Sequence, residues 1–348
     1  MLDCSMRRPG MLLFRPPETP PDKPARLSYH ISRAPQEPRE HISTDSQDTL
    51  VHLARWNGAS FDAMAECWEH GLDLAISSGS RIAGLVRATQ APRAHTIRTR
   101  SMLFRQQRDR NWVVATVRAI IDAKILNQFN LLRLYHDRPY DAWADGAAIN
   151  PNPAWGEAYS DALQNLRRDR RSLDIVDSVA SLRGIEGHAA KHYFASWPPL
   201  IGNPSFRRQA RQAADQTNLL LDLSYARLAH RVTLYLLDQG FDIAAGMLHG
   251  DDDGRPSLAL DLMEPLRPLV ADRFCLRLIR QQHVDWFYHD RGRWHLSTLG
   301  WREIKDRWQS WLIGHSRRPG MDQHIAQTVT AFRDWIVHDQ PLTFPRLR

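Results

Sequence analysis

The segment Gly246–Pro268, GMLHGDDDGRPSLALDLMEPLRP, carries the pattern from which the rest of the chain can be interpreted. Its second half predicts a buried helix, because leucines recur three to four residues apart at positions 258, 262, 266 and 269. The same helix carries Asp261 and Glu264, and their spacing of three places both on one flank. A solvated helix face and a metal-binding edge both account for these acids, and His249 lies in the turn just before them.

Composition excludes several classes of protein. The chain has 348 residues, of which 43% are hydrophobic, enough for two packed domains or one large one. Its mean hydropathy of -0.49 and the absence of a long apolar run argue against a membrane span and predict a cytoplasmic protein. The isolated Cys4, Cys67 and Cys275 indicate buried thiols rather than a disulfide framework or a zinc site.

The charge indicates a nucleic-acid partner. The net charge is +7, and arginine supplies nearly all of the positive charge because lysine occurs only at positions 23, 124, 191 and 305. Arginine binds phosphate oxygens in bidentate fashion, which suits a surface that handles DNA. A GC-rich genome that favours arginine codons is the alternative explanation.

Local patterns predict an α+β protein with two domains. Eight of the 21 prolines fall in the first 40 residues, so residues 1–48 are expected to be irregular apart from a short strand at 27–32. Further strands are predicted at 49–54, 72–77 and 81–86, with a short helix at 61–71. A small N-terminal β-rich domain over residues 1–98 is therefore expected, with a Pro-rich irregular start.

After residue 98 the pattern becomes helical. Apolar residues at three-to-four spacing predict an all-α domain over residues 99–348, with the metal site in it. The predicted helices span residues 112–135, 174–194, 206–239, 257–281, 298–314 and 322–339. Loops are expected over residues 136–156 and 196–205, which are rich in Pro, Gly and Asn.

Glu186 occupies a position where an apolar residue belongs. In a helix over SLRGIEGHAAKHYF (181–194), Leu182, Glu186 and Tyr193 share one stripe. A buried carboxylate without a partner costs several kcal/mol, so Glu186 must be neutralised, paired with arginine or bound to a cation. An arginine-paired structural glutamate remains the alternative at this point.

The four candidate residues together suit a hard divalent cation. Carboxylates with one imidazole, drawn from separate segments, favour Mn²⁺ or Mg²⁺ over zinc. The candidates are Glu186, His249, Asp261 and Glu264. The run Asp251–Asp253 beside Gly254 is expected to form a solvated turn instead.

Arginines accompany the acidic residues. Three of them, Arg207, Arg208 and Arg211, are expected to open the helix over 206–239 and to contact DNA. Four more follow the acidic pair, namely Arg267, Arg273, Arg277 and Arg280, and Arg267 is also expected to contact DNA. A divalent cation ringed by arginines suits phosphodiester chemistry, because both neutralise developing charge. Trp155 and Trp197 are expected in the core or an interface rather than stacked on bases.

Several segments together resemble the Cas-one family, the CRISPR-associated endonuclease and integrase of spacer acquisition. The resemblance covers about residues 60–348 and rests on RGIEGHAAKHYF, NLLLDLSY with Asn218 and Tyr225, and the opening segment. KILNQ (124–128), HLSTLGWREIKDRWQSWL (295–312) and the terminal LTFPRLR add to it. In that family a glutamate on a helix, a histidine in a G-x-x-H turn and a D-x-x-E helix form the metal site. The matching residues are Glu186, His249 and Glu264 as metal ligands, with Asp261 as a nearby second acid.

The resemblance implies a β-rich N-terminal domain, a helical C-terminal domain, a homodimer and a small partner of the Cas-two type. It implies a substrate of double-stranded DNA, a prespacer whose 3′-hydroxyl attacks a phosphodiester of a CRISPR array with Mg²⁺ or Mn²⁺. Two segments depart from the family pattern: the Pro-rich N-terminus, and QARQAADQTN (209–218), which lacks the usual Pro-Pro.

Two alternatives remain. A DNA-binding scaffold that has lost catalysis would show a replaced ligand, but all four candidate residues are present. A transposon-borne integrase tends to carry an added C-terminal DNA-binding domain, for which the end at Arg348 is expected to leave no room. We therefore expect a catalytic protein of spacer acquisition.

Overall fold

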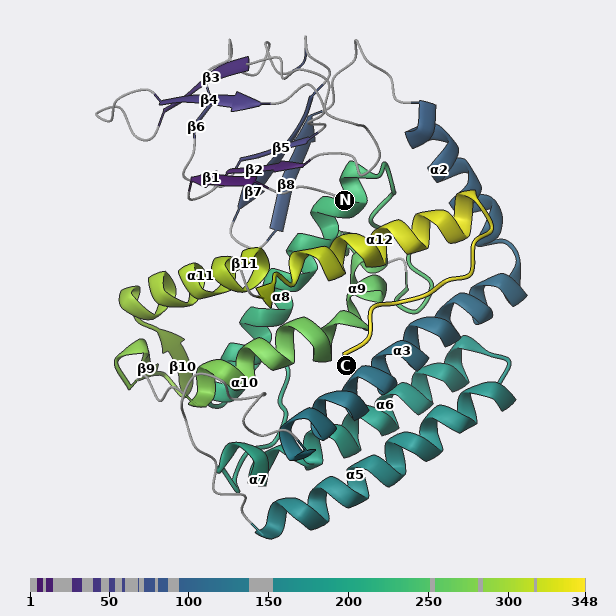
Figure 1. Cartoon of the computed structure of the whole chain (residues 1–348), viewed down its shortest axis with the longest axis vertical. Helices are drawn as coiled ribbons and strands as arrows, with labels where there is room; N and C mark the ends of the chain where they lie inside the picture. Colours follow the sequence, from purple (N-terminus) through teal and green to yellow (C-terminus); the bar gives the residue numbers. More distant parts are fainter. Residues whose placement is uncertain are drawn as a thin grey trace. The chain divides into compact units, whose positions relative to one another are not determined.

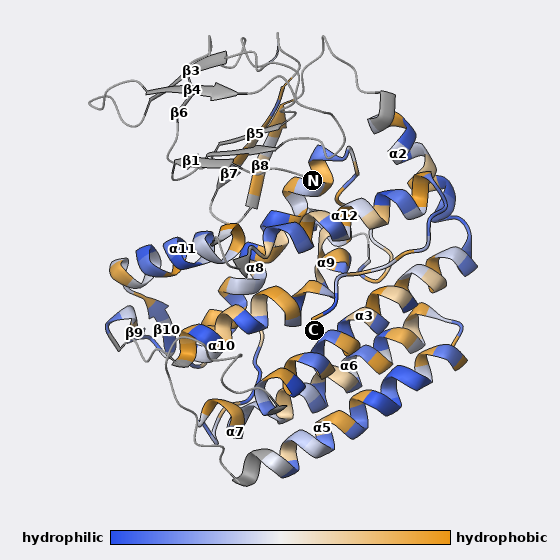
Figure 2. Ribbon diagram, in the orientation of Figure 1, coloured by the Kyte–Doolittle hydropathy of each residue, from blue (hydrophilic) through white to orange (hydrophobic). Residues whose placement is uncertain are grey.

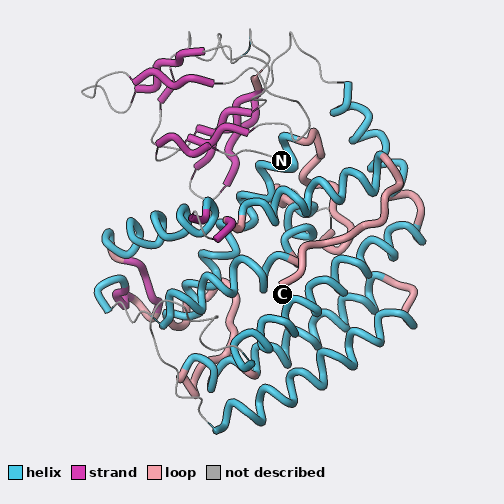
Figure 3. The backbone as a smooth tube through the Cα atoms, viewed as in Figure 1, coloured by secondary structure: helices cyan, strands magenta, loops and turns pink. Residues whose placement is uncertain are grey.

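The computed structural model describes the strands within residues 5–59, Trp68, and residues 72–78, 81–86, 94–137, 153–250, 254–280, 284–315 and 318–347. The chain divides into two compact units, Met1–Ser101 with Thr233–Asp242, and Met102–Val232 with Ile243–Arg348. The strands of the five-stranded and the three-stranded sheet belong to the first unit, and most of the described helices belong to the second (Figures 1 and 3). This arrangement confirms the predicted α+β class.

The first unit contains two sheets. The larger has the order β1-β2-β5-β7-β8, with neighbours antiparallel except for the parallel pair β5 and β7. Its strands are Ser5–Arg8, Met11–Phe14, Leu50–Leu53, Asp73–Ser78 and Arg81–Val86. The smaller sheet has the antiparallel order β4-β3-β6, formed by Glu40–Thr44, Leu27–Ser32 and Gly58–Ala59.

The expectation that residues 1–48 are irregular was wrong, because β1, β2 and β4 lie there as well as β3. The reason is the distribution of proline. Pro9 lies between β1 and β2, five prolines lie between β2 and β3, and Pro35 and Pro38 lie between β3 and β4. Proline lacks the N–H that a sheet ladder uses, so its density marks the connections while the strands stay free of it. The predicted helix at 61–71 lies outside the described residues except for Trp68.

Three helices of the second unit lie side by side: α3 (Arg110–Asp137), α5 (Pro153–Ser172) and α6 (Val179–Ala195) (Figure 1). Helix α3 and most of α6 fall where apolar spacing predicted them. Helix α5 was missed, because only a few apolar residues such as Ala162, Leu163 and Leu166 face its neighbours. Figure 2 shows polar residues along much of its length. Helix α2 (Ala94–Gln106) precedes α3, and a 3₁₀ turn, η1 (Leu173–Ile175), follows α5.

Helix α8 spans Gln216–Asp238, so the predicted start at residue 206 was wrong. Arg211 and Ala213 have φ of 64° and 46°, which no helix accommodates. The Asp215 carboxylate then accepts the Asn218 N–H at 2.7 Å and caps the first turn. Arg207, Arg208 and Arg211 therefore lie in the loop before α8. The expected loop at 196–205 contains the short helix α7 (Trp197–Ile201).

The predicted helix at 257–281 is divided into three parts: α9 (Ser257–Met263), the π-helical η2 (Arg267–Asp272) and α10 (Arg273–Arg280). Pro268 has no N–H to donate to the Glu264 carbonyl, which accepts from Arg267 N at 3.3 Å instead. The remaining elements are η3 (Val284–Trp286), the hairpins β9–β10 (Phe287–Asp290, Arg293–Leu296) and β11–β12 (Gly314–His315, Arg318–Pro319), α11 (Thr298–Ile313) and α12 (Asp322–Val337).

The interior of the second unit is apolar and aromatic. Trp197, Tyr193 and Phe206 are fully buried, which agrees with the expected core position of Trp197, whereas the side chain of Trp155 lies outside the described set. Cys275 is a buried free thiol, and Cys4 and Cys67 lie outside the described residues. Within the described ranges, no helix is both long and apolar enough to cross a bilayer.

We predict that His230 on α8 makes stability depend on pH. Burial, reinforced by the charges of Arg231 and Arg227, lowers the pKa of His230 to about 4. The unfolded chain has the ordinary value of about 6.5, so it binds more protons than the folded chain between these values. The free energy of unfolding should therefore fall by about 2 kcal/mol between pH 7.5 and pH 5 through this residue. Urea unfolding of the wild type and His230→Gln at both pH values measures it; an equal fall in both proteins would contradict the assignment.

Candidate metal and DNA site

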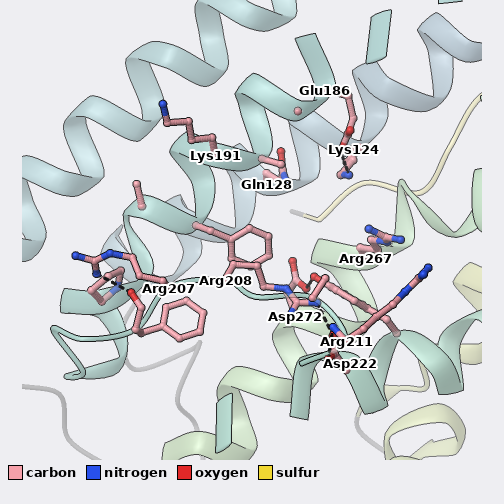
Figure 4. A pocket seen from close by; sticks show the side chains of 18 of the residues that line it. Lys124, Gln128, Glu186, Lys191, Arg207, Arg208, Arg211, Asp222, Arg267 and Asp272 are labelled. Carbon is pink, nitrogen blue, oxygen red and sulfur yellow. Dashed lines mark hydrogen bonds and ion pairs between the residues drawn. The ribbon is translucent and has the colours of Figure 1, made fainter. Parts of the chain in front are cut away.

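Two carboxylates from separate helices meet at one ammonium group. Lys124 on α3 is paired with Oε1 of Glu186 on α6, and its Nζ lies 2.5 Å from Oε2 of Glu264, just after α9. The side chains of Lys124 and Glu264 are 5% and 4% exposed, and that of Glu186 is 25% exposed. Figure 4 shows Lys124 and Glu186 pointing toward each other. The fold thus builds a position where two carboxylates hold a cation.

The charges around this position compensate one another. Arg267 Nη2 lies 3.0 Å from Glu264 Oε1. Burial by itself would raise the pKa of Glu264, but Arg267 and Lys124 outweigh burial and lower it. Burial would likewise lower the pKa of Lys124, but Glu264 and Glu186 raise it above its ordinary value. Lys124 and Glu264 therefore each stabilise the charged form of the other.

Asp261 holds the turn that carries His249. Its fully buried Oδ2 accepts the N–H groups of Met247 and Leu248 at 2.6 and 2.9 Å. Its Oδ1 accepts the His249 N–H at 2.9 Å and lies 2.7 Å from His249 Nδ1. A proton on Nδ1 leaves Nε2 with a lone pair, which is the form of histidine that binds metals. The sequence analysis grouped Asp261 with the catalytic residues. Because its carboxylate contacts the backbone and the ring of His249, we assign it a positioning role.

Gly246 and Arg183 fix the same turn. A Cβ atom at Gly246 would lie 2.5 Å from the His249 carbonyl oxygen and 2.6 Å from Ser257 Cβ, so only glycine fits. Arg183 on α6 donates from Nε to the Leu248 carbonyl at 2.6 Å, which ties the helix of Glu186 to the turn of His249. Gly246 belongs to the GMLHG segment and Arg183 to the RGIEG segment. The sequence alone did not reveal that they make these contacts.

The KILNQ segment supplies two residues whose roles the sequence did not reveal. Lys124 is the ammonium described above, and a buried lysine on an apolar helix is the signal that could have drawn attention to it. Asn127 donates to the carbonyls of Pro265 and Pro345 at 2.8 and 3.0 Å and accepts the Leu347 N–H at 2.9 Å. The segment after Glu264 and the terminal LTFPRLR segment are therefore both joined to α3.

The predicted metal ligands are partly assembled. Glu186 and Glu264 converge, and His249 is near enough to Glu264 to contribute to lowering its pKa. Across the described residues, no three His, Cys, Asp or Glu side chains are gathered closely enough to bind one metal ion. The donor set of two carboxylates and one imidazole still fits Mg²⁺ or Mn²⁺, because the carboxylates already share a cation. Asp251–Asp253 lie outside the described residues.

A pocket of about 1500 Å³ opens at Glu186. Lys124 and Glu186 contribute to its wall, and the four predicted DNA-binding arginines line it together: Arg207, Arg208, Arg211 and Arg267 (Figure 4). By contrast, Arg273 and Arg277 lie over the Trp311 ring at 5.4 and 5.1 Å. The expected ring of arginines is thus drawn mainly from the loop before α8.

The arginines of the pocket are held by specific partners. Arg208 donates to Asp222 Oδ1 at 2.6 Å and to Asn218 Oδ1 at 2.8 Å. Arg207 Nη1 donates to the carbonyls of Pro204 and Phe206 at 3.1 and 2.7 Å. These contacts stiffen the loop, so that the pocket presents guanidinium groups in defined positions.

Tyr225 and Asp272 lie beside Arg267 in the pocket wall. Asp272 accepts the hydroxyls of Tyr193 and Tyr225 at 2.8 and 2.6 Å, and burial raises the pKa of this carboxyl. The Arg267 guanidinium lies 4.7 Å from the centre of the Tyr225 ring. Arg267 is thereby held between Glu264 and an aromatic face, and Tyr225 of the N-x-x-L-x-x-x-Y pattern contributes that face.

Comparison with known proteins identifies the family. The profile of "CRISPR associated protein Cas1" matches residues 30–310. The chain is 30% identical over 270 residues to "CRISPR-associated endonuclease Cas1 2" of Rhodospirillum rubrum, which covers 75% of this chain and 74% of that one. This protein therefore belongs to the Cas1 family, as the sequence motifs indicated.

Solved structures share the fold. A chain of a "Cas6-RT-Cas1--Cas2 complex" superposes with a TM-score of 0.67 at 20% identity, covering 97% of this chain and 34% of that longer chain. A casposase bound to its integration product superposes with a TM-score of 0.60 at 16% identity, covering 97% of this chain and 94% of that one. At these identities the likeness shows the fold alone.

We predict that Asp261→Asn destabilises the protein. The amide nitrogen would face backbone N–H groups that now donate to an oxygen, leaving buried donors without acceptors. The free energy of unfolding should fall by about 2–4 kcal/mol, measured by urea unfolding. The control Asp290→Asn, at a side chain that is 60% exposed, should change it by less than about 0.5 kcal/mol. Equal stability of both variants would refute the positioning role.

Proposed function

We propose that this protein is a divalent-metal-dependent DNA endonuclease and integrase that inserts short prespacer duplexes into a CRISPR array. The observation that carries the proposal is the convergence of Glu186 and Glu264 on one cation position, beside a pocket lined by arginines. Membership of the Cas1 family, and the name endonuclease given to the Rhodospirillum rubrum relative, support it.

Glu186, Glu264 and Nε2 of His249 would hold Mg²⁺ or Mn²⁺. A bound cation of this kind supplies charge neutralisation at the scissile phosphate and makes a hydroxyl more acidic. Asp261 keeps the His249 ring oriented for this task through its Nδ1 contact. Arg267 contacts Glu264 and also lines the pocket, so its guanidinium would neutralise charge that develops on phosphate oxygens.

The proposed reaction exchanges one phosphodiester for another. The 3′-oxygen of the prespacer forms a new bond to an array phosphorus, and the bond from that phosphorus to the array 3′-oxygen breaks. The attacking hydroxyl loses its proton and the leaving oxygen gains one, so no protein nucleophile is required. Two such transfers, one on each strand, insert the duplex.

The partners belong to the same proposal. We expect a homodimer that assembles with a Cas2-type protein in the cytoplasm, supported by the structural relative that comes from a complex with Cas2. A transposon-borne integrase is the competing enzyme, supported by the likeness to a casposase. An inactive DNA-binding scaffold is the competing non-enzyme, and the intact Glu186, Glu264 and His249 argue against it.

Strand transfer tests the proposal directly. We expect the wild type with its Cas2 partner and Mn²⁺ to join a labelled 3′-hydroxyl duplex to a supercoiled plasmid that carries a CRISPR array. Glu264→Ala should reduce joining by at least about a hundredfold, since it removes a carboxylate from the metal position. The control Glu303→Ala, on the surface of α11, should join normally.

The outcome separates the three candidates. Joining confined to the array supports the proposal, whereas joining only of transposon-end duplexes without regard to the array supports the casposase-like function. DNA binding with no joining by the wild type would leave the scaffold.

The pocket arginines provide a second prediction. The double variant Arg207→Ala with Arg211→Ala should weaken duplex binding by about tenfold or more at about 0.1 M salt and flatten the salt dependence of the affinity, because two phosphate contacts are lost. Fluorescence anisotropy across a salt series measures both. Arg291→Ala, at a side chain that is 92% exposed, is the matched control. Unchanged affinity in the double variant would place the DNA elsewhere.

A further inference from the structure

Lys124 lies between the two glutamates that the proposed function assigns to the metal ion. Its ammonium lies between Oε1 of Glu186 and Oε2 of Glu264, and its side chain is almost completely buried. A buried lysine that contacts two carboxylates is not needed to fill space, because an apolar residue would pack on α3 at no electrostatic cost. The lysine therefore has a role in compensating these two charges.

The charge balance of the cluster changes when a divalent cation enters. Glu186 and Glu264 contribute two negative charges, and Lys124 and Arg267 contribute two positive charges, so the cluster is neutral. A divalent cation added to this neutral set would leave two excess positive charges in a desolvated site. If the ammonium leaves at the same time, the excess is halved, so departure of the lysine favours metal binding.

The site offers both a place for the ion and a route for the lysine. Metal–oxygen bonds of about 2.1 Å are shorter than hydrogen bonds, so a cation at the ammonium position draws the same two carboxylates slightly closer. Lys124 also lines the pocket, so its flexible side chain can leave the carboxylates for a space where DNA phosphates would accept it.

We propose that Lys124 is a built-in competitor of the metal ion: it holds Glu186 and Glu264 together in the metal-free protein, and the divalent cation displaces it. The proposal rests on the function proposed above and adds a residue that controls how tightly the metal binds. A lysine at this position prevents repulsion of the two carboxylates before loading, and it weakens metal affinity by competing for the same oxygens.

Replacing the lysine by an uncharged residue of similar length tests this competition. We expect Lys124→Met to bind Mn²⁺ at least about tenfold more tightly than the wild type, measured by isothermal titration calorimetry on the full chain. In EDTA the variant should melt at a lower temperature than the wild type, because its carboxylates lose their partner, and Mn²⁺ should raise its melting temperature by more. If Lys124→Met does not fold in EDTA, Lys124→Gln allows the same comparison.

Lys191→Met is the matched control, since Lys191 lines the same pocket and carries the same charge but is exposed. It should leave Mn²⁺ affinity within about twofold of the wild type. Unchanged or weaker Mn²⁺ binding by a folded Lys124 variant would overturn the competition. Tighter binding together with wild type that fails to join DNA would uphold the competition and refute the integrase function, whereas no Mn²⁺ binding by any of the proteins would overturn both.

Discussion

The burial of two carboxylates at one position is the constraint on which the arrangement of the helical unit depends. Glu264 is almost fully buried and Glu186 is three-quarters buried, so neither charge is stabilised by water alone. Two cations compensate these charges, Lys124 from α3 and Arg267 from the π-helical segment. Removing either cation would leave a buried negative charge uncompensated, which is among the more expensive changes in a protein interior. Three segments distant in sequence are therefore held in register by electrostatics as well as by packing.

A second set of contacts holds the segments around this charged cluster in place. Asp261 shapes the turn of His249, and Arg183 ties that turn to the helix of Glu186. Asn127, one helical turn after Lys124, joins α3 to the chain after Glu264 and to the C-terminal segment. On the pocket side, Asp272 and Tyr225 support Arg267. Groups outside the proposed ligand set thus hold the residues of that set in place, as in preorganised sites.

Much of the fold could be predicted from local pattern. Apolar spacing located α3, α6, α11 and α12, since each buries one continuous face. It failed where the local signal was weak or opposed: α5 has few apolar residues, and prolines obscured the strands that they separate. The start of α8 was misplaced because the left-handed φ of Arg211 and Ala213 is set by contacts that no spacing reveals, such as the hydrogen bond from Arg211 N to Asp222.

By itself the sequence determined which residue types are available for chemistry. Local motifs mark the carboxylates of Glu186 and Glu264, the imidazole of His249 and the arginines near position 207. The carboxylates are conspicuous because a charged group is costly on the apolar face of a helix. Only the tertiary structure decided which of these residues lie close together and which other side chains join them. It placed Asp261 behind His249 and Lys124 between the two glutamates. The physical reason is that burial and charge compensation act between segments about 60 to 140 residues apart, where periodicity carries no information.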